Sequence, residues 1–524
     1  MGTLTEDVFI NRKEAEALFK ELLESKPAYR VLNFYGKNGM GKSYFQDYLQ
    51  AKYLYNKDYI VINLNLHNPI FHNPKTALFE IVKKLEIKYD FNFLALWKAY
   101  ALLWQKRFKK NPLIFTQDLP YVEEIKKLMK VDKKGNVIVD FIKGLFQNNV
   151  VKAFERLKNL NTKEIEKELF YFFAADLRKL KEEKKQKDIV FIIDGHETLS
   201  KDTTPCMRDF WLQELVVQFG KEALFLIISQ EKLLWEKCNI VWKSQIKSYE
   251  FTHFTKEESY RYLQESGFDN AQLIEAICVS TRGHPFYLSL AKYAYIYQTF
   301  DKLPITKEDI SKSFLATLNK DEQKLLEILS HTRYFTKEII QAVAKKYTIK
   351  IGPELLHKLL SYDFIKVVAK GKFILDEELK KIFLQKENEE KKREYQSFMF
   401  SYYENSLFML NQKKVKENPL IIDEILEEAW YYLNIISKEP LVHFEWLDYY
   451  VSRFFNLAAW EPFIERYNKI IPKLQKSTET YAKSKLVSLY NNLAGLYETM
   501  GEVTIAKNYY NKVVKLSRPK QLLA

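Results

Sequence analysis

The chain has few cysteines, and the three that it has are far apart. Cys206, Cys238 and Cys278 show neither the paired spacing of a zinc site nor the density of a disulfide-stapled domain. We therefore expect no metal held by thiolates and no disulfide framework. This cysteine usage fits a reducing, cytoplasmic compartment.

Glycine and proline are also scarce, with 14 of each among 524 residues. Because these two residues interrupt helices and strands, their scarcity predicts a largely helical chain with few irregular linkers. The length is sufficient for several domains, and the apolar fraction of 47% predicts a globular fold with a large buried core.

Long apolar runs are absent as well. No run approaches the roughly 20 residues that a membrane-spanning helix needs. The first ten residues, MGTLTEDVFI, are acidic and lack the apolar core of a signal peptide, and Glu6 stands where a myristoylation pattern has serine or threonine. We therefore expect a cytoplasmic protein that does not associate with membranes.

Acidic residues are outnumbered: 68 aspartates and glutamates stand against 82 lysines and arginines, for a net charge of +14. Such a balance fits a nucleic-acid or anionic-lipid partner, but it also fits solvated, lysine-rich helix faces. The second case is the more frequent one, so charge alone assigns no partner.

What the chain does contain is a glycine-rich turn between a predicted strand and a predicted helix. The residues GKNGMGKS, numbers 36–43, match the G-x-x-x-x-G-K-[S/T] pattern of a P-loop. Its glycines let backbone N–H groups point at phosphate oxygens, and the following helix presents its positive end to the same anion. Lys42 is expected to reach the β- and γ-phosphates of ATP or ADP, and Ser43 to ligate Mg²⁺. The predicted nucleotide-binding residues of this turn are Gly36, Asn38, Gly39, Met40, Gly41, Lys42, Ser43 and Tyr44.

A P-loop predicts a second strand that ends in a carboxylate, and residues 188–194 supply it. Residues 189–193 are all apolar, as in a central parallel strand that is covered on both faces. Asp194 then lies at the carboxyl end of the strand, where it is expected to hold Mg²⁺. Glu197 either orients or deprotonates the attacking water, or it is a solvated loop acid.

Three further strands are predicted at residues 58–64, 223–229 and 247–254. Together with the P-loop strand and the Asp194 strand, they predict an α/β domain with a parallel sheet. The strand that ends at Ser229 is the expected neighbour for sensing the γ-phosphate, with Ser229 and Gln230 as its polar tip.

In this order, the motifs resemble those of the STAND ATPases, the signal-transduction branch of the AAA+-like P-loop ATPases. The stretch VFINRKEAEAL resembles the box that precedes the P-loop and packs near adenine, which implies nucleotide contacts from Phe9, Asn11 and Arg12. The stretch from 283 to 285, Gly-His-Pro, resembles an element that begins a lid helix, which implies a nucleotide contact from Pro285.

Two departures from that family bear on the chemistry. Gln230 stands where the family usually has an arginine, and a neutral amide stabilises phosphate charge less than a guanidinium does. Asp376 stands where the family often has a histidine that meets the β-phosphate of ADP. Both changes favour nucleotide binding with slow, Mg²⁺-dependent ATP hydrolysis over rapid turnover.

The remainder of the chain is predicted to be helical and to divide into segments. The P-loop domain, residues 1–254, contains a helical insertion at about 74–187, whose residues 131–146 form a small hairpin or loop. A helical lid follows at 255–315, a winged-helix pattern of three helices and two strands at 316–390, and a helical region at 391–524.

One aromatic stripe in the insertion is expected to be core: Phe91, Phe93, Trp97, Tyr100 and Trp104. The lid is expected to begin with a capping box made by Thr255 and Glu258.

Residues 484–517 resemble one tetratricopeptide repeat. The pattern predicts two antiparallel helices joined near Gly501, with Leu493 and Ala494 packed against Ala506 and Tyr510. A single repeat leaves one apolar face open, so these helices are expected either to pack on the chain's own core or to bind a protein partner.

These features leave three functions open. The first is an ATP/ADP-dependent switch that controls conformational opening and homo-oligomerisation in signalling or defence. The second is a DNA-binding, AAA+-like initiator or regulator that uses the winged helix, and the third is a non-catalytic ATP-binding scaffold. The complete set of Lys42, Ser43, Asp194 and Glu197 argues against the scaffold. Nucleic acid is less favoured because no recognition helix within 318–388 is rich in arginine.

Overall fold

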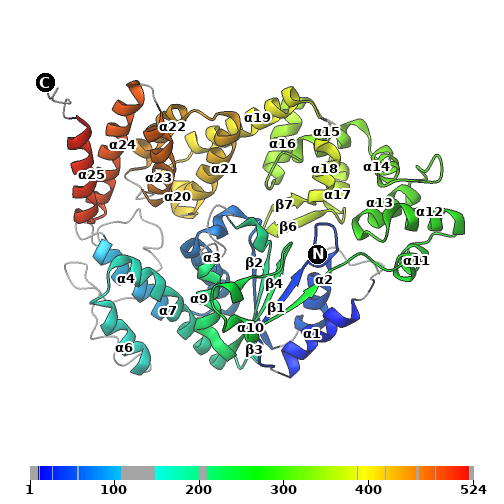
Figure 1. Ribbon diagram of the computed structural model, residues 1–524, viewed down its shortest axis with the longest axis horizontal. Helices are drawn as coiled ribbons and strands as arrows, with labels where there is room; N and C mark the ends of the chain where they lie inside the picture. Colours follow the sequence, from blue (N-terminus) through cyan, green and yellow to red (C-terminus); the bar gives the residue numbers. More distant parts are fainter. Residues whose placement is uncertain are drawn as a thin grey trace. The chain divides into compact units, whose positions relative to one another are not determined.

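The computed structural model describes residues 10, 12–25, 27–55, 58–107, 148–199, 209–385, 387–418, 420–455, 460–477 and 480–517. The chain forms two compact units (Figure 1). One comprises residues 1–74 and 181–395, and the other comprises residues 75–180 and 396–524. The predicted nucleotide contacts Phe9 and Asn11 and the predicted hairpin at 131–146 lie outside the described residues.

The first unit is built on a five-stranded sheet in the order β2-β3-β4-β1-β5, in which every neighbouring pair is parallel (Figure 1). The strands are β1 (Val31–Tyr35), β2 (Tyr59–Asn65), β3 (Asp188–Asp194), β4 (Ala223–Ser229) and β5 (Ile246–Glu250). The P-loop strand β1 and the Asp194 strand β3 both pair with β4, so the carboxyl ends of all three meet at one edge of the sheet. This confirms the predicted α/β fold.

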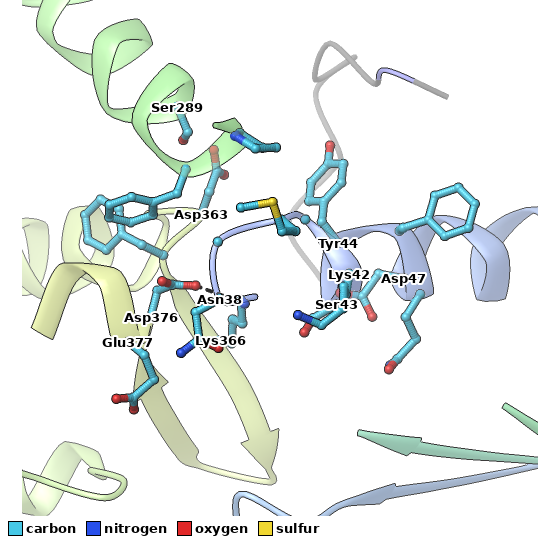
Figure 2. Close-up of a pocket in the computed structure, with 18 of the residues that line it drawn as sticks. Asn38, Lys42, Ser43, Tyr44, Asp47, Ser289, Asp363, Lys366, Asp376 and Glu377 are labelled. Carbon is cyan, nitrogen blue, oxygen red and sulfur yellow. Dashed lines mark hydrogen bonds and ion pairs between the residues drawn. The ribbon is translucent and has the colours of Figure 1, made fainter. Parts of the chain in front are cut away.

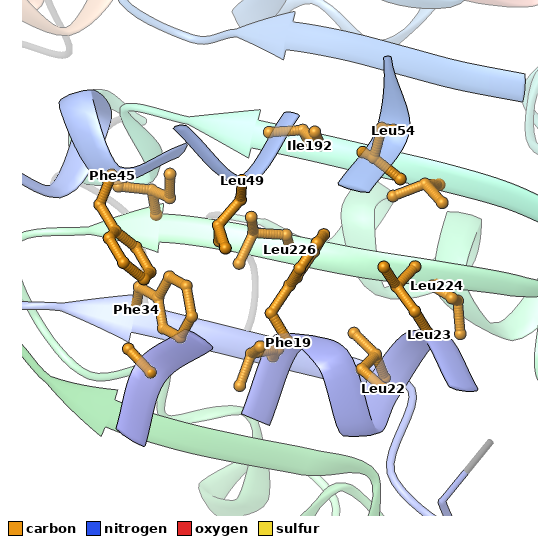
Figure 3. Close-up of a cluster of buried hydrophobic side chains, with 14 of the residues drawn as sticks. Phe19, Leu22, Leu23, Phe34, Phe45, Leu49, Leu54, Ile192, Leu224 and Leu226 are labelled. Carbon is orange, nitrogen blue, oxygen red and sulfur yellow. The ribbon is translucent and has the colours of Figure 1, made fainter. Parts of the chain in front are cut away.

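Helices α1 (Lys13–Glu24) and α2 (Lys42–Leu49) pack on one face of the sheet (Figure 3). Phe19 of α1 and Phe45 of α2 are buried there in one cluster with Leu224 and Leu226 of β4. Complete burial of such a side chain contributes about 1.5–3 kcal/mol. Every residue of β3 and β4 is buried, as expected for strands that are covered on both faces.

On the other face of the sheet, Phe191 of β3 stacks on Phe225 of β4, and both rings contact Phe219 of α9 (Phe210–Phe219). The sheet edge that carries the P-loop and Asp194 is therefore held between two packed layers. Rigid strands position the side chains at their ends more exactly than loops do.

Four helices follow the sheet in the predicted lid: α11 (Lys256–Glu265), α12 (Ala271–Thr281), α13 (Pro285–Ile296) and α14 (Lys307–Ala316). The predicted capping box is confirmed. Glu258 N donates to Thr255 Oγ1 at 3.1 Å, and Thr255 N donates to the Glu258 carboxylate at 2.8 Å. Helix α13 begins with Pro285, whose missing N–H costs nothing in the first turn of a helix.

The next segment contains the three helices and two strands that the sequence predicts. They are α15 (Lys320–Leu329), α16 (Lys337–Tyr347), α17 (Pro353–Leu360), β6 (Ile365–Ala369) and β7 (Lys372–Leu375), and α18 (Glu377–Leu384) follows. Strands β6 and β7 form an antiparallel hairpin in which Lys366 is opposite Ile374. The hairpin turns at Gly371, whose φ of +74° favours glycine.

The second unit combines helices of the insertion with the C-terminal helices. From the insertion come α3 (Pro74–Tyr89), α4 (Leu94–Arg107), α6 (Asn148–Leu157) and α7 (Thr162–Glu183). From the C-terminal part come α19 (Glu389–Phe408), α20 (Gln412–Glu417), α21 (Ile421–Ile436), α22 (Pro440–Phe454), α23 (Trp460–Lys476), α24 (Thr480–Thr499) and α25 (Val503–Ser517). The aromatic stripe of the insertion is buried, as predicted. No helix in the described part of the chain is long and apolar enough to cross a membrane.

Helices α24 and α25 confirm the predicted helix pair around Gly501 (Figure 1). Leu493, Ala494 and Ala506 are buried, but Tyr510 is 37% exposed. Tyr510 nevertheless contacts the partner helix, because its hydroxyl donates to the Glu498 carboxylate of α24 at 2.9 Å. Its neighbour Tyr509 stacks on Tyr497 of the same helix, with ring centroids 5.6 Å apart. Both tyrosines therefore contact α24, Tyr509 through its ring and the more exposed Tyr510 through its hydroxyl.

The cysteines depart from the expectation at one position. Cys278 is buried and free, whereas Cys238 is disulfide-bonded. The cysteine spacing excluded a framework of several disulfides, and it did not indicate that Cys238 forms one. Spacing along the sequence does not determine which residues the fold brings within bonding distance, and a disulfide requires only that distance and geometry.

Candidate functional site

The glycine-rich turn joins β1 to α2, as predicted, and its glycines have positive φ values. Gly36, Gly39 and Gly41 have φ of +148°, +72° and +82°. A Cβ at Gly36 would lie 2.5 Å from the carbonyl oxygen of Phe251, and one at Gly39 would lie 2.6 Å from the ring of His284. Backbone conformation and close packing therefore both require glycine at these two positions.

Lys42 is buried over this turn. Its Nζ donates hydrogen bonds to the carbonyl oxygens of Gly36, at 2.5 Å, and of Lys37, at 2.8 Å. Burial lowers the pKa of Lys42 to about 8, although the carboxylate of Glu197 acts in the opposite direction. The amine thus lies at the turn itself, where the P-loop pattern expects the phosphates.

The two predicted magnesium ligands are within hydrogen-bond distance of each other. Ser43 Oγ donates to Asp194 Oδ2 at 3.1 Å, and the Asp194 side chain is buried. Mg²⁺ binds oxygen ligands and usually takes only one or two carboxylates from the protein, with the phosphates of its substrate and water completing the shell. The described residues contain no cluster of three or more His, Cys, Asp or Glu side chains that could hold a metal ion.

Glu197 is held by the tip of β4. The backbone N–H and the side-chain amide of Gln230 both donate to its carboxylate, at 3.2 and 3.1 Å. Ser229 is buried, and its side chain does not bind Glu197. Its Oγ donates to Glu231 O at 2.6 Å and accepts from Asn33 Nδ2 at 2.9 Å. Sequence reasoning identified the tip but did not foresee that Gln230 would bind Glu197.

Arg12 lies at the start of α1 and contacts the chain just after β5. Its guanidinium donates to the carbonyl oxygen of Thr252 at 2.6 Å and lies 4.6 Å from the ring centroid of Phe254 and 5.4 Å from that of Phe251. Burial lowers the pKa of Arg12. The segment before the P-loop is thereby fixed to the aromatic residues that follow the sheet.

These groups surround one cavity of about 530 Å³, a size typical of small-molecule sites. The cavity lies at the P-loop (Figure 2). The predicted site residues that line it are Arg12, Asn38, Gly39, Met40, Gly41, Lys42, Ser43, Tyr44, Asp194, Glu197 and Pro285. Gly36 and Ser229 are not among the lining residues.

The lid and the β6–β7 hairpin also reach this cavity. Phe286 N of α13 donates to Gly39 O at 3.1 Å, and the side chain of Glu378 in α18 comes close to the same glycine. Lys366 of β6 and Asp376, the residue before α18, line the cavity (Figure 2). The P-loop is therefore in contact with both later segments of the first unit.

Several charged residues of the cavity were not anticipated from the sequence, and Lys366 and Asp47 are two of them. Lys366 Nζ lies 3.3 Å from Asp376 Oδ2; burial alone would lower the pKa of Lys366, but the carboxylates of Asp376 and Asp194 outweigh it and raise this pKa. Burial and then Asp194 raise the pKa of Asp47 in α2 to about 6. A lysine within a strand and an aspartate within a helix carry no motif, so no sequence signal marked either residue.

Comparison with known proteins gives similarity only to solved structures. No family model and no curated protein matches the chain. The chain is similar to the Walker-type ATPase Paby2304 of Pyrococcus abyssi, with a TM-score of 0.33 and 14% identity over 72% of this chain and 97% of that one. It is also similar to Drosophila ORC bound to DNA, with a TM-score of 0.30 and 12% identity over 70% of this chain and 92% of that one. The strand order and the P-loop geometry described above are those of an α/β P-loop ATPase fold with a helical C-terminal region.

Proposed function

We propose that the chain is an ATP/ADP-dependent switch of the STAND type, a slow ATPase whose nucleotide state controls opening and homo-oligomerisation in signalling or defence. One observation carries the proposal: a single cavity is lined by the P-loop, by helix α13 and by the β6–β7 hairpin. A ligand in that cavity contacts all three segments, so its phosphate content can bias their arrangement.

In this proposal the phosphates lie on residues 36–43, with Lys42 as their cation, and Ser43 and Asp194 hold Mg²⁺. The ion supplies charge neutralisation to the phosphoryl group when it is bound. The adenine lies toward Arg12, Phe254 and Pro285, which line the same cavity. Aromatic and apolar side chains suit a flat base, and the polar turn suits the phosphates.

Slow hydrolysis follows from the state of Glu197. A carboxylate that orients or deprotonates water needs an oxygen directed at that water. Both donors of Gln230 bind the Glu197 carboxylate and hold it toward the tip of β4, and Gln230 supplies no positive charge to the developing phosphate. We therefore expect a turnover well below the roughly 10 s⁻¹ that is the median for enzymes.

The switch itself is proposed to act through Gly39. Its carbonyl oxygen binds Phe286 N, and the lid and α18 pack so closely on it that no Cβ fits. A nucleotide that shifts the turn by a fraction of an ångström breaks or tightens these contacts, because packed contacts are not continuously deformable.

The first test is a Lys42→Ala variant, which removes the cation that the P-loop places at the phosphates. We expect a large loss of affinity for ATP–Mg²⁺ and ADP, of about tenfold or more, measured by titration calorimetry. Mass measurement of the wild type is expected to show a larger assembly with ATP–Mg²⁺ than with ADP, and the variant is expected to show no such difference. Lys37→Ala is the control, because Lys37 is exposed on the same turn. Undiminished nucleotide binding by Lys42→Ala would contradict the proposal.

The second unit is proposed to receive the signal or the protein partner. Helix α25 buries Ala506 and leaves Val503 67% and Val514 49% exposed, which is the open face expected at the end of a helical array. A Val503→Glu/Val514→Glu double variant is expected to keep wild-type affinity for ATP–Mg²⁺ and to alter the ATP-dependent assembly. Loss of nucleotide affinity with an unchanged assembly would contradict this division of roles.

A further inference from the structure

We propose that Lys366 of strand β6 binds the phosphate oxygens of the nucleotide. When the nucleotide binds, the Lys366 ammonium leaves its present partner, the Asp376 carboxylate, and contacts the phosphate instead. This inference rests on the proposed function and adds to it a site residue that lies outside the P-loop, more than 300 positions along the chain. It makes the β6–β7 hairpin a part of the nucleotide site.

The position of Lys366 supports this role. Its side chain lines the same cavity as Lys42, Ser43 and Asp194 and is 35% exposed (Figure 2). The strand that carries it is held in register: Lys366 is opposite Ile374 in the hairpin. A further bridge pairs Phe335 with Phe373, so the hairpin is anchored beyond its own turn.

The hairpin and α18 are also held against the P-loop. An ideal Cβ on Gly39 would lie 3.2 Å from Cγ of Glu378, in the first turn of α18. Asp376 begins that helix, and its backbone N–H donates to Phe364 O, one residue before β6, at 2.8 Å. The elements that carry Lys366 and Asp376 therefore reach the loop that binds the phosphates.

The hydrogen bond between Lys366 and Asp376 is long and can be broken without loss of the helix cap. Its Nζ lies 3.3 Å from Asp376 Oδ2, whereas charge-assisted hydrogen bonds of this kind are usually about 2.7–2.9 Å long. Asp376 has a second role that does not need the lysine, because its Oδ1 accepts Glu378 N at 2.9 Å and caps α18. The pair can therefore separate without leaving the helix end uncapped.

The charges around Lys366 explain why its ammonium would move from Asp376 to the phosphate. Facing it are the carboxylates of Asp376, Asp194 and Asp47 and the ammonium of Lys42. With Mg²⁺ engaged by Asp194, the triphosphate of ATP still brings excess negative charge to a loop in which Lys42 is the one lysine that lines the cavity. A second ammonium balances that charge, and a lysine is a common point-charge partner for phosphate.

The test compares variants of the full chain by calorimetric titration with ATP–Mg²⁺ and ADP–Mg²⁺. Lys366→Gln is expected to weaken both affinities by about tenfold or more, and Lys366→Met, which keeps the aliphatic stem, to do the same. Lys366→Arg keeps the charge and is expected to remain within about threefold of the wild type. Lys370→Gln is the matched control, since Lys370 is exposed at the turn of the same hairpin, and we expect no change.

Asp376→Asn separates a phosphate-binding role from a purely structural ion pair. Asparagine still caps a helix, so α18 is retained, but the carboxylate that competes for the amine and repels phosphate is gone. We therefore expect Asp376→Asn to bind ATP–Mg²⁺ about threefold tighter or more, opposite in sign to Lys366→Gln. If the two variants weaken binding alike, or if Lys366→Gln binds as the wild type does, the inference is overturned.

Failure of the proposed function has a different signature. If the wild type binds neither nucleotide, or if Lys42→Ala binds both as well as the wild type does, the proposed function falls and this inference with it. If Lys42→Ala loses binding while Lys366→Gln and Lys366→Met keep it, the function stands and the role of Lys366 alone is overturned. Equal thermal melting of the Lys366→Gln and Lys370→Gln variants would exclude a general loss of structure as the cause of weaker binding.

Discussion

An Asp194→Ala variant is expected to hydrolyse ATP about 100-fold more slowly than the wild type, or slower still. The Asp194 carboxylate is buried at the end of β3 and accepts a hydrogen bond from Ser43, so it holds one side of the proposed Mg²⁺ site. A metal ion that neutralises charge in the loose transition state contributes several kcal/mol, and each 1.36 kcal/mol corresponds to a tenfold change in rate.

Glu197→Gln is the informative comparison, because Glu197 shares the cavity but not the hydrogen bond to Ser43. Gln230 holds its carboxylate toward the tip of β4, so we expect a smaller loss of rate, of about tenfold. Single-turnover rates measured over a series of Mg²⁺ concentrations distinguish the two variants. Asp194→Ala is expected to need more Mg²⁺, whereas Glu197→Gln keeps the wild-type dependence. An Asp194→Ala variant with full activity would exclude this residue from the metal site.

Much of the proposed phosphate site could be predicted because its chemistry requires particular residues at fixed spacing. The turn needs residues without a Cβ, and Gly36 and Gly39 indeed have neighbours that leave no room for one. Asp194 could be placed because a fully apolar run of strand length predicts a buried parallel strand, and its end is a defined point. Such inferences depend on local sequence alone.

Contacts between distant segments could not be predicted in this way. Gln230 binds Glu197 across 33 positions, and Lys366 reaches a loop that precedes it by more than 300. A glutamine after a strand or a lysine within one is compatible with many environments, and only the packing of β4 or of the hairpin selects one of them. The same limit applies to Tyr509, because helical periodicity alone did not indicate that its ring would stack on Tyr497.

The packing partner of the helical insertion, residues 75–180, also could not be predicted from local sequence. Its position in the chain assigns the insertion to the P-loop domain. The apolar faces of its helices do not indicate which other helices they pack against. In the structure, residues 75–180 form one compact unit with residues 396–524. Charged residues connect the two parts of this unit: Glu461 of α23 forms ion pairs with Lys75 of α3 and with Arg107 of α4. Arg107 also pairs with Glu166 of α7 at 3.0 Å.

The last prediction follows from that junction. A Glu461→Ala variant is expected to destabilise the second unit by about 2–3 kcal/mol. Removing one partner of a buried ion pair costs about 3–5 kcal/mol, because the remaining charge is left without compensation, and the 36% exposure of the Glu461 side chain lowers this figure. Both Lys75 and Arg107 lose a partner at once, which keeps the cost above that of an ordinary surface pair.

Because the chain has two units, the measurement should report on the second one locally. Amide hydrogen exchange in α4 and α23 gives a local free energy of opening, and both helices are expected to lose protection in Glu461→Ala. Glu465→Ala is the matched control on the same helix. Glu465 pairs with Lys469, and both side chains are more than half exposed, so we expect a loss below about 1 kcal/mol. Equal losses in the two variants would show that the junction cluster has no special role.

The stabilisation by Glu461 also has a defined pH dependence. Burial alone would raise the pKa of Glu461, but Lys75 and Arg107 outweigh it and hold the pKa at about 2, below the usual value of 4.5. The folded state therefore favours the ionised carboxylate, and its contribution is complete above about pH 4.5 and is lost as the pH falls toward 2. The difference in protection between wild type and Glu461→Ala should be constant from pH 7 to pH 5 and shrink below that. A difference that grows on acidification would contradict an ionised Glu461 as the link between the insertion and the C-terminal helices.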